Sequence, residues 1–293
     1  MTEVRKIKDW LAKYILATVG FFNIIILVII FMFIFLNSLE FFKQYPIKDF
    51  LFGKEWIPLS GKYGMLPLIT GTFWITIIAL IIAIPLGVFA ALYIREYAPK
   101  KTRNILKMLV ETMSALPSVV LGFIGLYVLS GPIKNLFGLK SGLTALTGGV
   151  ILALMALPTI VSFTDDALKA LDSSYKQASL ALGANKLETI VKILLPAAAP
   201  GIFAGIMLGF GRVLGETMTV LMVTGNAPII ADNPLTSVRA LTATIAAEMG
   251  EVVQGSVHYH GLFALGFVLF VISFITNTIA DVYVRKSRKL TGK

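Results

Sequence analysis

Long charge-free runs of apolar residues recur along the chain. A helix needs about 20 residues to cross a hydrocarbon layer of about 30 Å, so runs of this length predict membrane spans. The fifth run is the exception, since Arg212 and Glu216 interrupt it. The pattern predicts an all-α fold, a polytopic membrane bundle of six transmembrane helices. The six runs cover residues 14–36, 66–94, 112–133, 141–164, 193–223 and 261–280.

Composition points to the same class of protein. Apolar residues make up 57% of the chain and charged residues 14%, whereas about a quarter of the residues of an ordinary soluble domain are charged. The absence of cysteine excludes disulfides and cysteine-ligated metals. The first apolar run is longer than the core of a signal peptide and no small-residue cleavage site follows it, so we expect a retained anchor helix.

The distribution of basic residues predicts the orientation. Six spans place both termini on one side, and with that side cytoplasmic, 18 of the 26 Lys and Arg residues lie in inner segments and seven in outer segments. An excess of Lys and Arg marks the cytoplasmic side, so we predict a prokaryotic inner-membrane protein with both termini inside. The net charge of +10 then faces anionic lipid headgroups, which indicates membrane lipid and not nucleic acid as a partner.

Three regions follow from this layout. Residues 1–65 form the anchor helix and an extracytoplasmic segment rich in aromatic residues and proline, and residues 66–283 form the transmembrane domain. Residues 284–293 form a basic cytoplasmic tail. Aromatic residues favour the membrane interface, so the extracytoplasmic part of the first region is expected to cap the outer face.

The outer segment between the last two spans is long and mixed in polarity. Val238, Leu241 and Ile245 belong to a set of apolar residues at helical spacing, which predicts a short amphipathic helix. His258 and His260 are two residues apart and could hold a metal, but no carboxylate stands close by in the sequence. We interpret them as residues of the membrane interface and predict no metal site.

The inner segment between spans four and five, residues 165–192, is unusually polar for this chain. Asp172 and Ser173 form a natural helix start, and Gly183 is expected to end the short helix that follows. Small residues on this helix permit the close approach of another protein. A loop of this kind can dock into a groove.

This loop resembles the signature loop of the permeases of binding-protein-dependent ABC importers. The matching positions are Gln177-Ala178-Ser179, Gly183, Ile193, Leu195 and Pro196. The family usually has Glu-Ala-Ala at the first three, so Gln177 and Ser179 are departures. The resemblance implies the type I importer permease fold, with the helix before the glycine seated on a separate ATPase.

Further stretches resemble the phosphate-specific permeases within this family. In that family two permease subunits pair. Residues 218–226 and the outer stretch 241–251 resemble the PstC subunit rather than its partner PstA, which implies a PstA-like partner in a heterodimer. It also implies two copies of a cytoplasmic ATPase and an extracytoplasmic phosphate-binding protein. The stretches are residues 157–162, 178–184, 195–198, 211–218, 218–226 and 241–251.

No covalent chemistry is predicted for the chain itself. A phosphate-binding loop of the form Gly, four residues, Gly-Lys-Ser/Thr is absent from the sequence, so another chain must hydrolyse any ATP that is used. Two alternatives remain open beside the phosphate importer: a permease for another oxyanion such as sulfate or molybdate, and a secondary phosphate carrier driven by an ion gradient. A membrane anchor without transport gives the charged pair in span five no role.

The charged pair is the candidate substrate path. A charge at membrane depth is costly and usually faces a partner or a water-filled path. Arg212 and Glu216 are four residues apart, so on one helix they are predicted to pair across a turn. A guanidinium suits a tetrahedral oxyanion, and we expect Arg212 to meet phosphate while Glu216 compensates it in the empty path. The alternative is a purely structural ion pair. Gly211 and Gly215 beside the pair are expected to admit a neighbouring backbone.

Glu111, at the inner start of span three, is a further charge near the membrane. We predict that it pairs with Lys107, one helical turn earlier. It is therefore not assigned to the substrate path.

Overall fold

The computed structural model describes the backbone of residues 3–290 and the side chains of residues 10–285. About four fifths of the chain, 79%, is helical, with one two-stranded hairpin, a short 3-10 turn at Pro58–Ser60 between its strands and three single π-helical turns next to α-helices. The α-helices are α1 Glu3–Gln44, α2 Ile47–Phe52, α3 Leu66–Leu92, α4 Lys100–Ser114, α5 Ser118–Ile124, α6 Ser130–Phe137, α7 Ala145–Lys169, α8 Ser173–Ala181, α9 Lys186–Thr189, α10 Leu195–Leu214, α11 Met218–Val223, α12 Leu241–Glu248 and α13 Val257–Leu290. The strands are β1 Trp56–Ile57 and β2 Lys62–Tyr63, and the π turns are Tyr93–Tyr97, Gly125–Leu129 and Ile190–Leu194.

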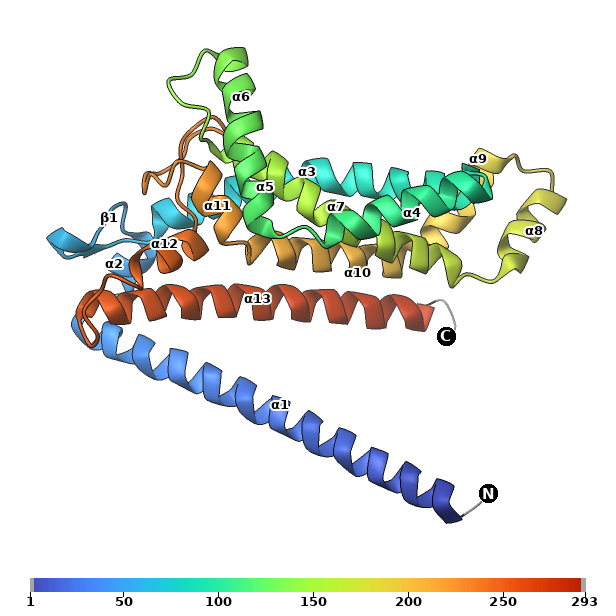
Figure 1. Cartoon of the computed structure of the whole chain (residues 1–293), viewed down its shortest axis with the longest axis horizontal. Helices are drawn as coiled ribbons and strands as arrows, with labels where there is room; N and C mark the ends of the chain where they lie inside the picture. The colour runs from blue at the N-terminus through green and yellow to red at the C-terminus, as the bar shows by residue number, and fades with distance from the viewer. Residues whose placement is uncertain (1–2, 291–293) are drawn as a thin grey trace.

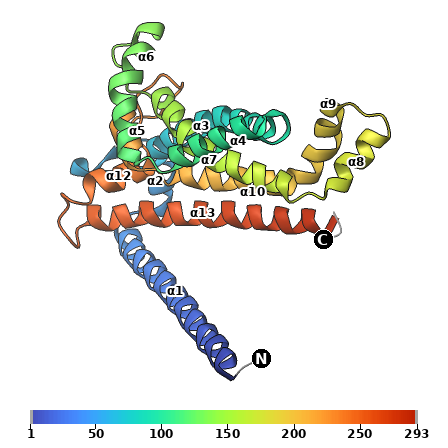
Figure 2. The ribbon, with the colours of Figure 1, turned by 45° about the vertical axis from the view of Figure 1, so that its right-hand side comes forward.

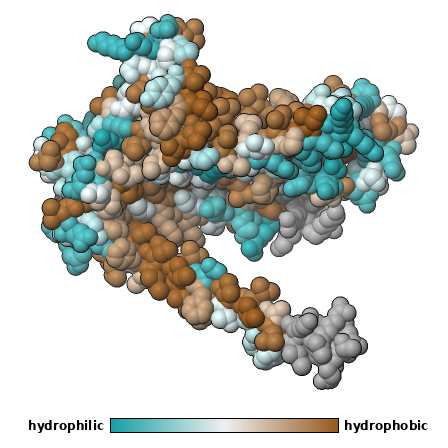
Figure 3. Space-filling view, in the orientation of Figure 1, coloured by the Kyte–Doolittle hydropathy of each residue, from teal (hydrophilic) through white to brown (hydrophobic). Residues whose placement is uncertain are grey.

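Six helices are long and apolar enough to cross a membrane, which confirms the predicted six-helix class. Hydrophobic side chains cover α1 and the middle of the bundle, whereas hydrophilic ones gather toward its ends (Figure 3). Both termini lie toward the end that carries α8 and α9, here called the α8 end (Figure 1). The opposite end carries the β1–β2 hairpin and is called the hairpin end. The six spans are Trp10–Gln44, Leu66–Tyr97, Ser118–Phe137, Ala145–Lys169, Lys186–Leu214 and Val257–Arg285.

The core of the bundle is built on α7, which packs against α3 and α10 (Figure 1). Glycines at Gly201, Gly205 and Gly209 bring α10 against α7, because an added Cβ would lie 2.5, 2.5 and 3.1 Å from atoms of that helix. The predicted close approach at Gly211 and Gly215 is wrong. Open space surrounds Gly211, and a Cβ at Gly215 would meet only the carbonyl oxygen of Gly211, at 3.4 Å.

Two of the predicted spans, the third and the fifth, are not continuous helices. The predicted third run, residues 112–133, is not one helix, because α4 ends at Ser114 and α5 begins at Ser118, after Pro117, whose fixed φ and missing N–H end a helix. In span five α10 ends at Leu214, so the predicted continuation of the same helix to residue 223 is wrong. The two breaks are joined, since the Thr219 hydroxyl donates to the Ser118 carbonyl oxygen at 2.9 Å. Beyond its break, span three turns across the bundle as α5 and α6 (Figure 1).

At the hairpin end, α2 and the hairpin pack into an aromatic core. Phe41, Phe50 and Trp56 are each at most 2% exposed, and α13 and α12 contribute the facing aliphatic side chains. Burial raises the pKa of the nearby Tyr63 phenol above its usual value. The segment predicted to cap the outer face therefore forms a packed aromatic cluster at the hairpin end, and its position relative to the membrane stays a prediction.

The predicted short helix between the last two spans is confirmed as α12, Leu241–Glu248, although its apolar residues do not gather on one face. The carboxylate of its last residue, Glu248, accepts hydrogen bonds from side chains of three separate segments. The donors are Trp56 Nε1 at 3.0 Å, Arg239 Nη1 at 2.7 Å and His258 Nε2 at 2.8 Å. Sequence analysis missed this carboxylate as the partner of His258. Within the described residues no group of three or more His, Cys, Asp or Glu could hold a metal ion.

Helix α1 is largely separate from the bundle. It contacts α13 through aromatic pairs such as Phe31 with Phe270, with ring centroids 5.1 Å apart, and Phe33 with Phe263 at 5.4 Å. Toward its N-terminus it diverges from α13, as both views show (Figures 1 and 2). At the other terminus, α13 continues through residue 290, so most of the predicted basic tail is helical and residues 291–293 lie outside the described part of the chain.

Candidate coupling and substrate-path sites

We call residues 165–192 the α8 segment. The side chain of Asp172 accepts a hydrogen bond from the Ser174 N–H at 2.8 Å and so caps the start of α8, as predicted. Gly183 follows the end of α8 with φ +85°, a left-handed conformation that favours glycine. Asn185 and Glu188 then form a reciprocal capping box that starts α9. The predicted helix start and helix end are both confirmed.

The signature residues divide into exposed and internal ones. Gln177, Ala178 and Gly183 are exposed, and Leu182 beside them is 89% exposed. Ser179 is buried instead, and its hydroxyl lies 2.9 Å from that of Thr189. The departure from the family pattern at Ser179 therefore lies inside the segment, where it joins α8 to α9, and not on its outer surface.

The remaining signature residues lie where the α8 segment returns to the bundle. Ile193 is in the π turn Ile190–Leu194, and Leu195 and Pro196 open α10. Ile193 and Leu195 are half-buried, whereas Pro196 is exposed. Proline is suited to the first turn of a helix, where its missing N–H would have no partner.

Arg212 lies near the end of α10, three residues before the break. Its Nη1 makes one long contact, 3.5 Å, to the Thr159 hydroxyl on α7. Among the side chains of residues 10–285, no carboxylate lies within ion-pair distance of this guanidinium. The predicted Arg212–Glu216 pair is wrong for this structure, because the helix that would align the two residues ends at Leu214.

Glu216 has other partners on the far side of the break. Its Oε1 accepts from the Thr219 N–H at 3.1 Å, and its carbonyl oxygen accepts from the Thr242 hydroxyl at 2.8 Å. The carboxylate thus lies at the start of α11, where a negative charge complements the helix dipole. Both Arg212 and Glu216 are half-buried.

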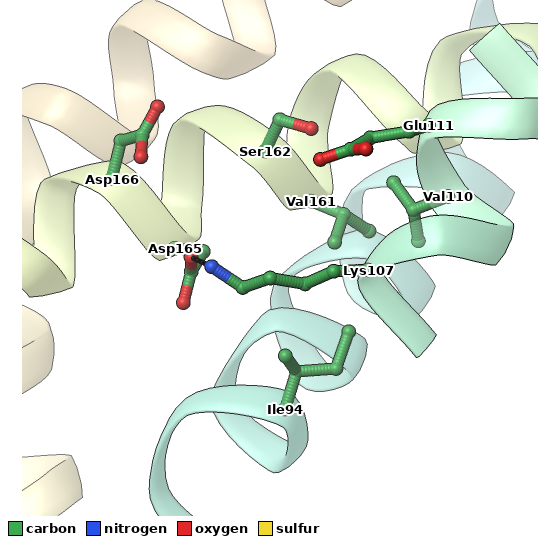
Figure 4. Close-up of a pocket in the computed structure, with 8 residues that line it drawn as sticks. All are labelled: Ile94, Lys107, Val110, Glu111, Val161, Ser162, Asp165 and Asp166. Atoms are coloured by element: carbon green, nitrogen blue, oxygen red, sulfur yellow. Dashed lines mark hydrogen bonds and ion pairs between the residues drawn. The ribbon is translucent and has the colours of Figure 1, made fainter. Parts of the chain in front are cut away.

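A second charged cluster lies at the α8 end, around a partly open cavity of about 120 Å³ between α4 and α7. Lys107 makes an ion pair with Asp165, and Arg95 Nη1 lies 3.9 Å from the same carboxylate, whose residue is 4% exposed. Figure 4 shows Lys107 reaching Asp165 while Glu111 points toward Ser162. The predicted Glu111–Lys107 pair is therefore wrong, because Lys107 has a buried partner on another helix.

A family model for the binding-protein-dependent transport system inner membrane component matches residues 83–289. The chain belongs to this permease family. The match spans α7, the α8 segment and α10, and it includes both charged sites described above. The permease is thus a multi-pass inner-membrane subunit, and the family implies a separate ATPase, a substrate-binding protein and a second permease as partners.

Relatives of this permease cover most of its length. The probable ABC transporter permease protein YqgH of Bacillus subtilis is 39% identical over 78% of this chain and 74% of its own. The phosphate transport system permease protein PstC of Mesorhizobium japonicum is 35% identical over 83% of this chain and 80% of its own. The probable PstC of Methanocaldococcus jannaschii is 30% identical over 98% of this chain and 96% of its own.

Solved structures share the permease fold. A chain of a bacterial alginate ABC transporter in complex with a pentasaccharide-bound periplasmic protein matches with TM-score 0.63 at 14% identity, covering 98% of both chains. A chain of the MetNI methionine ABC transporter in an inward-facing conformation matches with TM-score 0.59 at 17% identity, covering 80% of this chain and 99% of its own. These matches confirm the type I importer permease fold.

Proposed function

We propose that this chain is a permease subunit of an ATP-driven, binding-protein-dependent phosphate importer. The observation that carries the proposal is the Arg212 guanidinium, which lacks a carboxylate partner among the described side chains in a chain similar to permeases named for phosphate transport. An uncompensated charge in a membrane span is costly. It is explained if a passing anion supplies the missing charge, and a guanidinium fork suits the oxygens of phosphate.

In this proposal Arg212 and Glu216 lie on the substrate path at the span-five break. Arg212 binds phosphate transiently, since a path residue must release its ion as readily as it binds it. Glu216 stands at the start of α11 and holds it in place through the Thr219 N–H. The helix break supports this assignment, because irregular backbone at membrane depth is tolerated where it lines a cavity or is buried in protein.

The α8 segment is proposed as the contact with the ATPase. Its exposed residues Gln177, Ala178 and Gly183 and the apolar side chain of Leu182 present a surface that a groove could cover. Ile193, Leu195 and Pro196 would connect this surface to α10. The distribution of Lys and Arg supports a cytoplasmic position for this end of the bundle.

The partners follow from this orientation. We propose a PstA-like second permease in a heterodimer, two copies of a cytoplasmic ATPase and a phosphate-binding protein on the hairpin side. Residues 1–65 would act as anchor and outer cap, residues 66–283 as the transporting domain, and residues 284–293 as a basic tail near anionic lipid. The chain itself performs no hydrolysis in this scheme.

Reconstitution of this chain with the second permease, the ATPase and the binding protein in proteoliposomes tests the proposal. We expect phosphate uptake that requires ATP. Sulfate and molybdate should not compete with phosphate for this uptake. Scrambling residues 173–183 should abolish both ATPase association and uptake. Uptake by this chain alone without ATP, or preferential uptake of sulfate or molybdate, would contradict the proposal.

The path assignment is tested by Arg212→Lys and Arg212→Gln in the same system. Both variants should abolish uptake, because neither side chain reproduces the planar charged fork. Insertion and assembly are verified by co-purification with the ATPase. Arg285→Gln is the matched control, since Arg285 pairs with Asp281 on an exposed surface of α13 and should transport normally. Unimpaired phosphate uptake in either variant would show that the Arg212 side chain is not required on the substrate path.

A further inference from the structure

The helix of span two ends in a π turn, Tyr93–Tyr97, that directly follows α3. A π turn leaves backbone groups out of the regular helical pattern and is frequent at functional sites. Here Arg103 of α4 stabilises it, donating from Nε to the Ile94 carbonyl oxygen at 2.9 Å and from Nη2 to the Arg95 carbonyl oxygen at 2.5 Å. Ile94 itself is 3% exposed. The turn is therefore a defined, anchored element and not a frayed helix end.

Two neighbouring residues of this turn contact the α8 segment. Glu96 Oε2 lies 2.5 Å from Lys176 Nζ on α8, and the Glu96 side chain is only 9% exposed. Lys186 Nζ, from α9, lies 4.2 Å from the centroid of the Tyr97 ring. A carboxylate this deeply buried depends on its partner far more than an exposed one does, because burial without a partner leaves its charge uncompensated. The turn thus fastens to both short helices of the segment.

A third residue of the same turn, Arg95, contacts Asp165, which lines the charged cavity. Arg95 Nη1 lies 3.9 Å from Asp165 Oδ1, and Asp165 also pairs with Lys107 of α4 (Figure 4). The turn consequently touches α8 and α9 on one side and, on the other, the buried carboxylate of Asp165 in α7, where the α8 segment begins. The end of span two, α4 and span four meet at this point.

We propose that Glu96 is a positioning residue that transmits movement of the α8 segment to span two. When the ATPase displaces the α8 segment, the Glu96–Lys176 pair carries the π turn with it. Arg95 then shifts relative to Asp165, so that the ends of spans two and four rearrange together with α4. This inference rests on the proposed function, because it requires the α8 segment to be the ATPase contact.

The experiment uses the complete transporter in proteoliposomes, with phosphate uptake and ATP hydrolysis measured on the same vesicles. The variants are Glu96→Gln, Lys176→Met and the double reversal Glu96→Lys with Lys176→Glu. We expect ATPase association and hydrolysis to persist in the single variants while phosphate moved per ATP falls about tenfold, the size of an ordinary coupling between sites. The double reversal should restore a large part of the phosphate moved per ATP.

A matched control is available at the hairpin end. Glu55 and Lys62 form an ion pair with the same 2.5 Å distance, but both side chains are more than half exposed. Glu55→Gln should therefore leave uptake per ATP unchanged. A purely structural role of Glu96 would lower assembly and hydrolysis along with uptake, and the ratio would not move.

Three outcomes would overturn the inference. The first is an unchanged ratio of uptake to hydrolysis in Glu96→Gln and Lys176→Met. The second is loss of ATPase association in these variants, which would place the pair in docking or folding. The third is a double reversal as defective as the single variants. If the wild-type complex shows no ATP-dependent phosphate uptake at all, the proposed function fails, and the inference falls with it.

Discussion

At the hairpin end of the bundle, α2 and the hairpin are held by buried aromatic rings and by Glu248, which joins four segments of the chain. At the α8 end, α8 and α9 leave large apolar side chains such as Leu182 exposed, and the Glu96–Lys176 pair and a cation–π contact attach them to the end of span two. Only the two ends of the α8 segment, at Leu168 and Ile190, are buried in an apolar cluster. Separating segments that bury apolar side chains costs free energy in proportion to the apolar area exposed. A segment held by a few polar contacts can change position at a lower free-energy cost. We therefore expect the hairpin end to hold its shape and α8 and α9 to move more readily.

The largest expected effect comes from breaking the hairpin end with Glu248→Gln. Three donors converge on this carboxylate, and an amide can accept with only one oxygen, so Arg239 is left without its ion-pair partner in a mostly buried site. We expect a loss of about 3 kcal/mol in the free energy of unfolding. Thermal unfolding of the purified chain in detergent measures it.

Glu251→Gln is the control for this variant, since Glu251 lies three residues away and is exposed. It should shift the unfolding temperature little. Equal shifts in the two variants would show that Glu248 does not hold the hairpin end together.

The second effect concerns the helix pair that connects the two ends. In Gly205→Val the new side chain would start 2.5 Å from Phe163 Cβ on α7, so α7 and α10 must separate. Overpacking of this kind costs about 2 kcal/mol. Gly266→Val on α13 is the control, because nothing lies within 4 Å of its Cβ position. Detergent unfolding curves of the two variants should differ clearly, and coinciding curves would contradict the close packing of α7 on α10.

Local signals explain which parts of this architecture the sequence predicts. Charge-free runs long enough to cross a membrane mark the six spans, because the bilayer imposes a minimum length on each of them. The start of α8 at Asp172 and its end before Gly183 are also local, since caps and left-handed turns depend on single residues. The signature loop could therefore be located and its two helices predicted.

The wrong predictions share a different cause. Arg212–Glu216 and Lys107–Glu111 were both inferred from a spacing of four residues, which assumes a continuous helix and no competing partner. The first fails because α10 ends at Leu214, and the second because Asp165, 58 residues from Lys107 in the sequence, binds its ammonium. The Glu248 cluster was missed for the same reason, since Trp56 lies 192 residues away. Spacing along one helix carries no information about such partners.

The smallest expected effect sharpens the comparison at the α8 end. Gly183→Ala forces a Cβ into a left-handed conformation with φ +85°, although nothing lies within 4 Å to clash with it. The strain amounts to about 1 kcal/mol. Because the α8 segment is loosely attached, we expect this strain to shift the turn and weaken ATPase binding about fivefold while global stability stays nearly constant.

Gly138→Ala provides the matched control for this last prediction. Gly138 also has positive φ, +63°, and open space around it, but it ends α6, away from the α8 segment. Titration of the ATPase onto the solubilised permease compares the two variants directly. If Gly183→Ala and Gly138→Ala weakened ATPase binding by the same factor, the effect would be a general destabilisation of the permease. Weakening confined to Gly183→Ala would show that the conformation of the α8 segment, and not the rigidity of the bundle, sets the affinity for the ATPase.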